Sequence, residues 1–202
     1  FNTTKGPDDN AFFMTWEQNA RLFAYPMVDG PMPEHFEPFE SPVKNLFNGA
    51  DKNPCALFTD DPSAKRGKKE DYPYVVTTYS VTEHWQTGTQ TRNIPWLNEL
   101  ISCNFIELSE ELAAEKGIKS GDVVRVWNNR GSVKVRAMVT IRVKPMTING
   151  QKQHVVGMPH HFSWAGTFAT GDNINDLTPN VADPNSFIPE YKAFLVNIEK
   201  AA

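Results

Sequence analysis

The chain has 202 residues, a formal net charge of −4 and 40% hydrophobic residues, which fits one or at most two compact domains and excludes a disordered or fibrous chain. The mild acidity excludes the basic footprint of a nucleic-acid-binding protein, and no apolar run is long enough to predict a membrane span. With 15 Pro, 12 Gly, 13 Phe and 5 Trp, the composition favours a β-rich fold with long connections over a helical bundle.

Two cysteines, Cys55 and Cys103, are too few for an all-cysteine zinc site, an iron-sulfur cluster or a disulfide scaffold. They could form at most one disulfide. Neither lies in a CxxC motif, so we interpret both as small apolar side chains without a chemical role.

Residues 1–70 are rich in proline and charge and predict an extended, irregular arm with one short helix at 16–23. The chain starts at Phe1 without an initiator methionine or the features of a signal peptide, and we expect it to be a piece of something larger. The apolar side chains of the arm need a surface, either the following domain or an absent partner. They include Phe12, Phe13, Trp16, Leu22, Phe23, Phe36 and Phe39.

From residue 72 the pattern of apolar, β-branched and aromatic residues becomes that of a folded domain. The β-branched and aromatic stretch at 72–82 predicts a buried strand, 94–101 repeats apolar residues at helical spacing, and FIEL at 105–108 predicts a short strand. A helix should follow, with Ser109 as its N-cap and Gly117 as its left-handed C-cap.

The second half of this domain predicts further strands. Residues 123–143 form two alternating runs joined by NNRG at 128–131, which predicts a hairpin whose turn residues suit positive φ. Residues 147–159 add a turn and a strand, and 160–190 return to a loop. The final segment, 191–200, predicts a closing strand with Phe194, Val196 and Ile198 on one face.

Conventional catalytic motifs are missing, since the sequence contains no GxSxG, HExxH, P-loop or GxGxxG pattern. His160 and His161, followed by Phe162 and Trp164, could belong either to a substrate channel or to a packed aromatic loop. Residues 77–92, TTYSVTEHWQTGTQTR, combine hydroxyls, an imidazole, a glycine and a guanidinium just after a strand. Such a loop could bind a pyrophosphate or polar heterocycle, or could be a hydrated threonine-rich loop with Arg92 on the surface.

The string TTYSVTEHWQTGTQTRNIP resembles the opening motif of the C-terminal molybdopterin-dinucleotide-binding domain of the molybdenum and tungsten oxidoreductases related to dimethyl sulfoxide reductase. MPEHFEPFESP upstream and NDLTPNVADPNSFIPEYKAFLVNIEK at the end resemble the large subunit of respiratory, periplasm-facing formate dehydrogenases. The resemblance implies a mainly β fold with short helices, in which a six-stranded double-psi β-barrel at 71–202 follows the arm at 1–70.

Carried over position by position, the resemblance implies that residues 78–87 and the positions continuing the motif bind the dinucleotide cofactor. Asn175 matches the cofactor-binding asparagine of an NxLT pattern, and Lys192, beside Tyr191, matches the lysine of a PEYK pattern. An amide can read a heterocycle edge, and an ammonium can balance phosphate charge. The implied cofactor-binding residues are Thr78, Thr82, Glu83, His84, Trp85, Thr87, Gly88, Thr89, Thr91, Arg92, His160, Asn175, Tyr191 and Lys192.

The resemblance also implies the cofactor and the partners. The cofactor would be bis-molybdopterin guanine dinucleotide with molybdenum or tungsten, at a centre that oxidises formate to carbon dioxide and passes the electrons on to iron-sulfur clusters. The [4Fe-4S] cluster and the selenocysteine or cysteine metal ligand are expected only in the rest of the catalytic subunit, so the chain supplies no catalytic or metal-ligating residue and should not oxidise formate by itself. Further expected partners are an iron-sulfur electron-transfer subunit and, as an additional candidate, a cytochrome subunit, with the assembly in the periplasm.

Two alternatives stay open at this point. The same domain could serve a periplasmic nitrate reductase-like oxidoreductase, because residues outside this chain select the substrate. A free-standing double-psi barrel that acts as a binding module without a redox role is the alternative from a different class.

Overall fold

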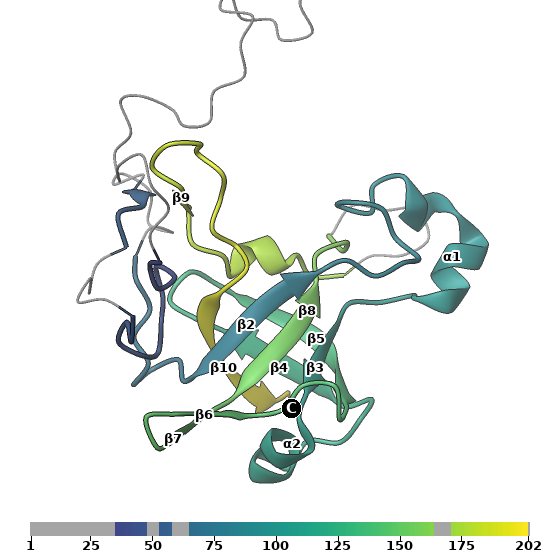
Figure 1. Ribbon diagram of the computed structural model, residues 1–202. Helices are drawn as coiled ribbons and strands as arrows, with labels where there is room; N and C mark the ends of the chain where they lie inside the picture. The colour runs from purple at the N-terminus through teal and green to yellow at the C-terminus, as the bar shows by residue number, and fades with distance from the viewer. Residues whose placement is uncertain (1–34, 48–52, 58–64, 164–170, 202) are drawn as a thin grey trace, which may run out of the picture. The chain divides into compact units, whose positions relative to one another are not determined.

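The computed structural model describes residues 35–47, 53–57, 65–163 and 171–201 (Figure 1). The helix predicted at 16–23 and the aromatic residues of the first part of the arm lie outside the described residues. None of the described helices is both long enough and apolar enough to cross a membrane.

Six strands close into a barrel in the order β10-β2-β8-β3-β5-β4 (Figure 1). The pairs β2–β8 and β3–β5 are parallel, and the remaining neighbours are antiparallel. This architecture confirms the predicted mainly β fold with a six-stranded double-psi barrel. The barrel strands are β2 (Tyr74–Tyr79), β3 (Phe105–Leu108), β4 (Val123–Trp127), β5 (Ser132–Val139), β8 (Val155–Pro159) and β10 (Phe194–Lys200).

The barrel interior is filled by branched apolar side chains from every strand. In β10 the predicted inward face is confirmed, because Phe194, Val196 and Ile198 are fully buried. Ile106 of β3 and Val156 of β8 are equally inaccessible to solvent. Burial of each such side chain stabilises the fold by roughly 1.5–3 kcal/mol, so the core provides a rigid frame for the loops at its ends.

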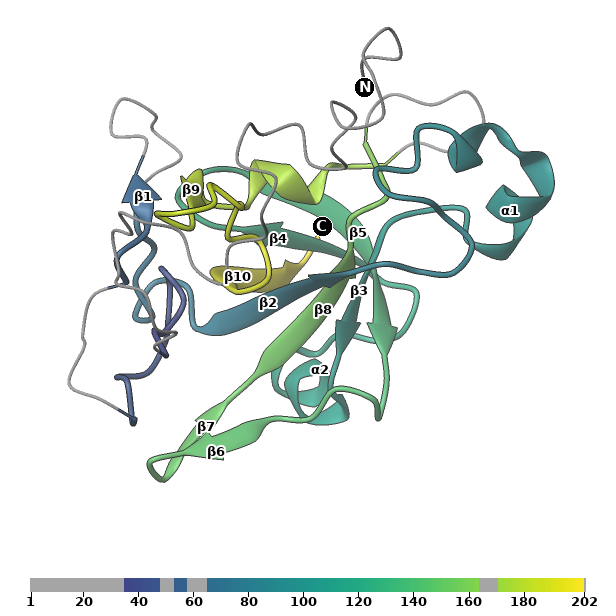
Figure 2. The ribbon, with the colours of Figure 1, turned by 45° about the horizontal axis from the view of Figure 1, so that its top comes forward.

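Helix α2 (Glu110–Lys116) lies at one end of the barrel, and the 3-10 helix η4 (Ile174–Asp176) lies at the other (Figure 2). Both predicted caps of α2 are confirmed. The Ser109 hydroxyl accepts a hydrogen bond from the Leu112 amide at 3.1 Å, and Gly117 adopts a left-handed φ of 64°. Helix α1 (Pro95–Leu100) also follows the prediction, after the 3-10 turn η3 (Thr91–Asn93).

The β4–β5 hairpin is confirmed, but the prediction of positive φ in its turn is wrong. None of the residues 128–131 has positive φ. The turn is held instead by the Asn128 side chain, whose Oδ1 accepts from the Arg130 amide at 2.9 Å. Gly131 serves close packing, because a Cβ there would lie 2.7 Å from the Asp176 carbonyl oxygen.

A separate small hairpin precedes β8. It consists of β6 (Met146–Ile148) and β7 (Gln151–Gln153), which form their own two-stranded sheet. Here Asn149 and Gly150 do have positive φ, 50° and 73°, as two-residue hairpin turns require.

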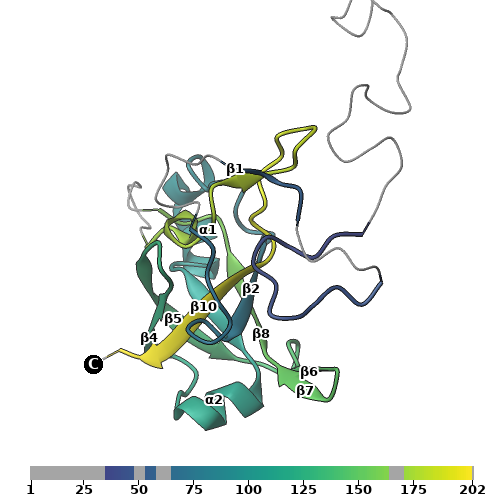
Figure 3. The same ribbon diagram turned by 90° about the vertical axis from the view of Figure 1, so that its left-hand side faces the viewer.

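The described part of the arm contacts the barrel domain. Strand β1 (Ala56–Leu57) pairs antiparallel with β9 (Val181–Ala182), and the two strands lie side by side in Figure 3. Glu40 is fully buried and forms an ion pair with Arg130. The division of the chain at residue 70 stays a prediction.

Candidate functional site

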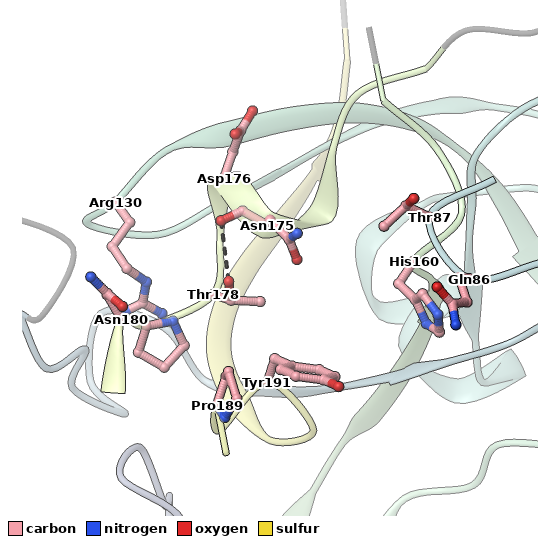
Figure 4. Close-up of a pocket in the computed structure, with 11 residues that line it drawn as sticks. Gln86, Thr87, Arg130, His160, Asn175, Asp176, Thr178, Asn180, Pro189 and Tyr191 are labelled. Atoms are coloured by element: carbon pink, nitrogen blue, oxygen red, sulfur yellow. Dashed lines mark hydrogen bonds between the residues drawn. The ribbon is translucent and has the colours of Figure 1, made fainter. Parts of the chain in front are cut away.

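An open cleft of about 790 Å³ lies at the end of the barrel that carries η4 (Figure 4). Segments far apart in the sequence build it: the loop after β2, the β4–β5 turn, the end of β8, η4 and the loop before β10. Its lining residues are Gln86, Thr87, Arg130, His160, Asn175, Asp176, Thr178, Pro179, Asn180, Pro189 and Tyr191. A cleft of this size is typical of sites for organic cofactors.

The loop after β2 forms one wall through Gln86 and Thr87. Gln86 has a φ of 46°, which is uncommon for a residue other than glycine. The buried ring of His161 holds this loop: its Nε2 accepts from the Val81 amide at 2.8 Å, and its Nδ1 contacts the Gln86 carbonyl oxygen. Burial lowers the pKa of His161.

His84 stabilises the same loop from inside and does not line the cleft. Its Nε2 lies 2.9 Å from the Ile101 carbonyl oxygen and its Nδ1 lies 3.1 Å from the Thr91 hydroxyl. The Trp85 amide donates to the same hydroxyl at 3.1 Å. His84 and Thr91 are therefore placed to shape the loop.

Arg92 is also buried in the loop packing, so the alternative that placed it on the surface is wrong. Its guanidinium donates to the Ser163 hydroxyl at 3.0 Å and to the Ser163 carbonyl at 3.2 Å. Burial lowers the pKa of Arg92. Gly88 allows this packing, since a Cβ on it would lie only 2.1 Å from the His161 carbonyl oxygen.

The opposite wall is formed by η4 and the residues after it (Figure 4). Asn173 caps η4 by accepting from the Asn175 amide at 3.0 Å, and the Thr178 hydroxyl donates to the Asn175 carbonyl at 3.2 Å. Both contacts use the backbone of Asn175. Its carboxamide is drawn in Figure 4 between η4 and the wall that carries Thr87.

Tyr191, Lys192 and Thr78 connect the loop before β10 to the end of β2. The Thr78 hydroxyl donates to the Tyr191 carbonyl at 3.0 Å, and Lys192 Nζ donates to the Thr78 carbonyl at 2.8 Å. His160 lies nearby, and its pKa is lowered by burial and secondarily by the charge of Lys192. Within the described residues, no group hydrogen-bonds to the buried His160 Nδ1.

The structure thus brings together part of the predicted set. Thr87, His160, Asn175 and Tyr191 line the cleft, and Thr78 and Lys192 are bonded to that group. The other predicted residues lie elsewhere on the loop, either in its packing or on its surface. These are Thr82, Glu83, His84, Trp85, Gly88, Thr89, Thr91 and Arg92.

The sequence motifs do not single out the lining residues Arg130, Asp176, Thr178, Pro179, Asn180 and Pro189, whereas Gln86 lies within the implied segment 78–87. Most of them flank a predicted residue within the same motif, so adjacency was the available signal. Arg130 has no such signal, because its sequence context predicts only a hairpin turn.

No cluster of three or more His, Cys, Asp or Glu side chains in the described segments is arranged to hold a metal ion. Cys55 and Cys103 are free, half-buried thiols.

Comparison with protein families matches residues 74–195 to the "Molydopterin dinucleotide binding domain", a domain that binds molybdopterin dinucleotide. The chain is 47% identical over 193 residues to "Formate dehydrogenase subunit alpha" of Megalodesulfovibrio gigas, a match that covers 95% of this chain and 19% of that protein. It is 45% identical to "Formate dehydrogenase, nitrate-inducible, major subunit" of Escherichia coli K12, covering 99% of this chain and 20% of that protein. The chain therefore spans about a fifth of the length of these relatives.

Among solved structures, acetylene hydratase from Pelobacter acetylenicus matches with a TM-score of 0.56 at 16% identity. The match covers 85% of this chain and 21% of that one. At this level of identity the likeness concerns the fold alone.

Proposed function

Because the chain belongs to the molybdopterin dinucleotide binding domain family, we propose that its cleft holds the dinucleotide part of a bis-molybdopterin guanine dinucleotide cofactor of molybdenum or tungsten. One observation carries this proposal: Thr87, His160, Asn175 and Tyr191, which come from distant segments, line one cleft (Figure 4).

The residues present fit such a group. His160 Nδ1 is a buried polar atom to which no described group bonds, and a buried polar group of this kind is stabilised when a ligand supplies its partner. The Asn175 carboxamide can donate and accept at once, which suits the edge of a guanine or pterin. Lys192, anchored on Thr78, brings a positive charge that can balance phosphate.

We further propose that the whole protein is the catalytic subunit of a formate dehydrogenase, which oxidises formate to carbon dioxide. When bound, the cofactor supplies the redox chemistry, and the protein sets its orientation, its electrostatic environment and access to it. In this account the described residues bind and orient the dinucleotide. The iron-sulfur cluster and the selenocysteine or cysteine ligand of the metal belong to the rest of the subunit.

The names of the relatives support formate as the substrate over the nitrate reductase-like alternative, since both relatives described above are formate dehydrogenase subunits. The family match at 74–195 weighs against a binding module without a redox role. The proposal includes an iron-sulfur electron-transfer subunit, a cytochrome subunit as a further candidate, and a periplasmic location; these rest on sequence resemblance.

Helix α1 offers a surface for the rest of the catalytic subunit. Trp96 and Leu100 lie four positions apart and so share one helix face, and they are 69% and 67% exposed, whereas the residue that α1 buries is Asn98. An apolar face turned to solvent is typical of an interface. Since the chain spans about a fifth of its relatives, we assign this face to the part of the subunit outside the chain.

The proposal is tested by purifying the chain together with its native neighbours and measuring molybdenum, tungsten and the GMP released by acid. We expect metal and guanine nucleotide in a constant ratio to the chain. An assembled complex that contains neither would contradict the proposed function.

A further inference from the structure

His161 is fully buried, and its ring holds two backbone groups of the loop that leads into the cleft. Nε2 lies 2.8 Å from the Val81 nitrogen, and Nδ1 contacts the Gln86 carbonyl oxygen. A backbone N–H can only donate and a carbonyl can only accept. The ring must therefore accept at Nε2 and donate at Nδ1, which is the neutral Nδ1–H tautomer.

These two contacts fix both ends of the segment 81–86. Gln86 keeps a φ of 46°, a conformation that persists only where surrounding contacts impose it. Two residues later, Gly88 has a φ of 76° and lies against the His161 backbone carbonyl. His161 thus contacts the loop through its ring and its main chain, and the residues held in between, Gln86 and Thr87, line the cleft.

We propose that His161 is a positioning residue, whose neutral ring holds Gln86 and Thr87 toward the cofactor and whose protonation releases the loop and weakens cofactor retention. This inference rests on the proposed function, because it assumes that the cleft holds the dinucleotide.

Protonation would remove the acceptor on which the Val81 amide depends, since an imidazolium donates from both nitrogens. Among the residues that the structure describes, the titratable and charged groups around the ring offer no compensation. His160 and His84 lie with ring centroids 4.5 Å and 6.1 Å from that of His161, Arg92 packs against Gly88, and Lys192 acts on His160. None of these groups can carry a negative charge, and the electrostatic influence of His160 and His84 lowers the pKa of His161 beyond the effect of burial.

The direction of the pH dependence follows from the lowered pKa of His161, which burial causes. While its ring holds the loop, His161 takes up a proton only at a pH below the ordinary histidine value of about 6.5. In that range His161 therefore binds more protons when the loop is released than when the ring holds it. The held loop is favoured above about pH 6.5 and becomes less stable as the pH falls below that value.

The experiment uses the assembled enzyme, incubated between pH 5 and 8 and desalted, after which GMP and metal are measured in the protein fraction. The wild type should keep its nucleotide at pH 7–8 and lose it progressively below about pH 6. His161→Gln retains a donor and an acceptor but cannot titrate, so its retention at pH 7 should stay within about twofold of the wild type and be flat with pH. His161→Phe removes both contacts and should lower retention at pH 7 by about tenfold or more.

The matched control is His154→Gln, which removes a buried histidine near the start of β2, at the other end of that strand from Val81. It should follow the wild type at every pH. The inference is overturned if His161→Phe retains nucleotide like the wild type, or if His161→Gln loses it with the wild-type acid dependence. A wild-type enzyme without guanine nucleotide at any pH would instead refute the proposed function itself.

Discussion

The carboxylate of Glu40 and the guanidinium of Arg130 form an ion pair with only 0% and 2% of their side chains exposed. The carboxylate also accepts from the amides of Gly67 and Leu195. Arg130 Nε donates to the Leu177 carbonyl at 2.7 Å. This pair joins the arm, the β4–β5 turn and the segment after η4, and it supports the wall of the cleft that Arg130 lines.

Glu40→Gln should destabilise the chain by about 3–5 kcal/mol, because it leaves the buried guanidinium without its counter-charge. The free energy of unfolding in urea measures the effect. The matched control is Glu199→Gln, which breaks the exposed pair with Arg125 (50% and 43% exposed) and should cost less than about 1 kcal/mol. Equal losses in the two variants would contradict the role of the buried pair.

Gly88→Ala should lower the free energy of unfolding by more than the strain of a left-handed backbone alone would. Gly88 and Gly117 have similar left-handed φ values, 76° and 64°, but a Cβ on Gly117 would meet no atom of the described residues within 4 Å. Gly117→Ala should therefore cost about 1–2 kcal/mol, and Gly88→Ala should cost about 1–3 kcal/mol more because of the clash with His161. The two free energies of unfolding are compared directly, and a difference near zero would show that the clash is relieved at no cost.

Cys55 should be unreactive at neutral pH. Burial, and secondarily the charge of Glu190, raise the pKa of its thiol to about 11, so at pH 8 only about one molecule in a thousand carries the thiolate that reacts. Iodoacetamide labelling followed by mass spectrometry should find Cys55 unmodified in the folded chain at pH 8 and modified after unfolding in urea. Because the unfolded thiol loses its proton at lower pH, the stability contributed by this group falls as the pH rises from about 9 to 11. Rapid labelling of folded Cys55 at pH 8 would contradict the raised pKa.

The exposed face of α1 should be required for attachment to the rest of the enzyme. The double variant Trp96→Glu, Leu100→Glu places charges on this apolar face, which we propose to be covered in the assembled enzyme. After limited proteolysis of the assembled enzyme, the barrel domain of this variant should separate from the rest, as measured by gel filtration. Ile141→Glu, at a position 70% exposed elsewhere on the barrel domain, is the control and should leave the domain attached. A double variant whose barrel domain stays attached, like that of the control, would contradict the proposal and leave the α1 face exposed to solvent.

The local elements of the fold could be predicted because their causes are local. Ser109 and Gly117 fix the ends of α2 through contacts within the helix itself, and the alternating residues of β10 define its inward face. The turn at 128–131 was predicted with the wrong geometry because an Asn side chain can replace positive φ by bonding to the following amides.

The long-range parts could not be read from the residues. Strands β1 and β9 pair over two residues each, across more than half of the chain, and no local pattern selects such a partner. The same holds for Glu40 and Arg130, which are 90 positions apart. In the site, Asn175 and Lys192 could be proposed only from the family resemblance. The fold of the loop decides that Thr87 lines the cleft while His84 packs inside the loop, and no sequence pattern distinguishes the two.

The central claim, that this cleft holds a molybdopterin guanine dinucleotide, is tested most directly by the nucleotide content of an Asn175→Ala, Lys192→Ala double variant of the assembled enzyme. Loss of a carboxamide contact and of a charge-assisted contact should lower the GMP retained per chain by at least about tenfold. The control Lys200→Ala removes the exposed contact with Asp122 and should retain wild-type levels. Wild-type nucleotide content in the double variant would contradict the assignment of the cleft.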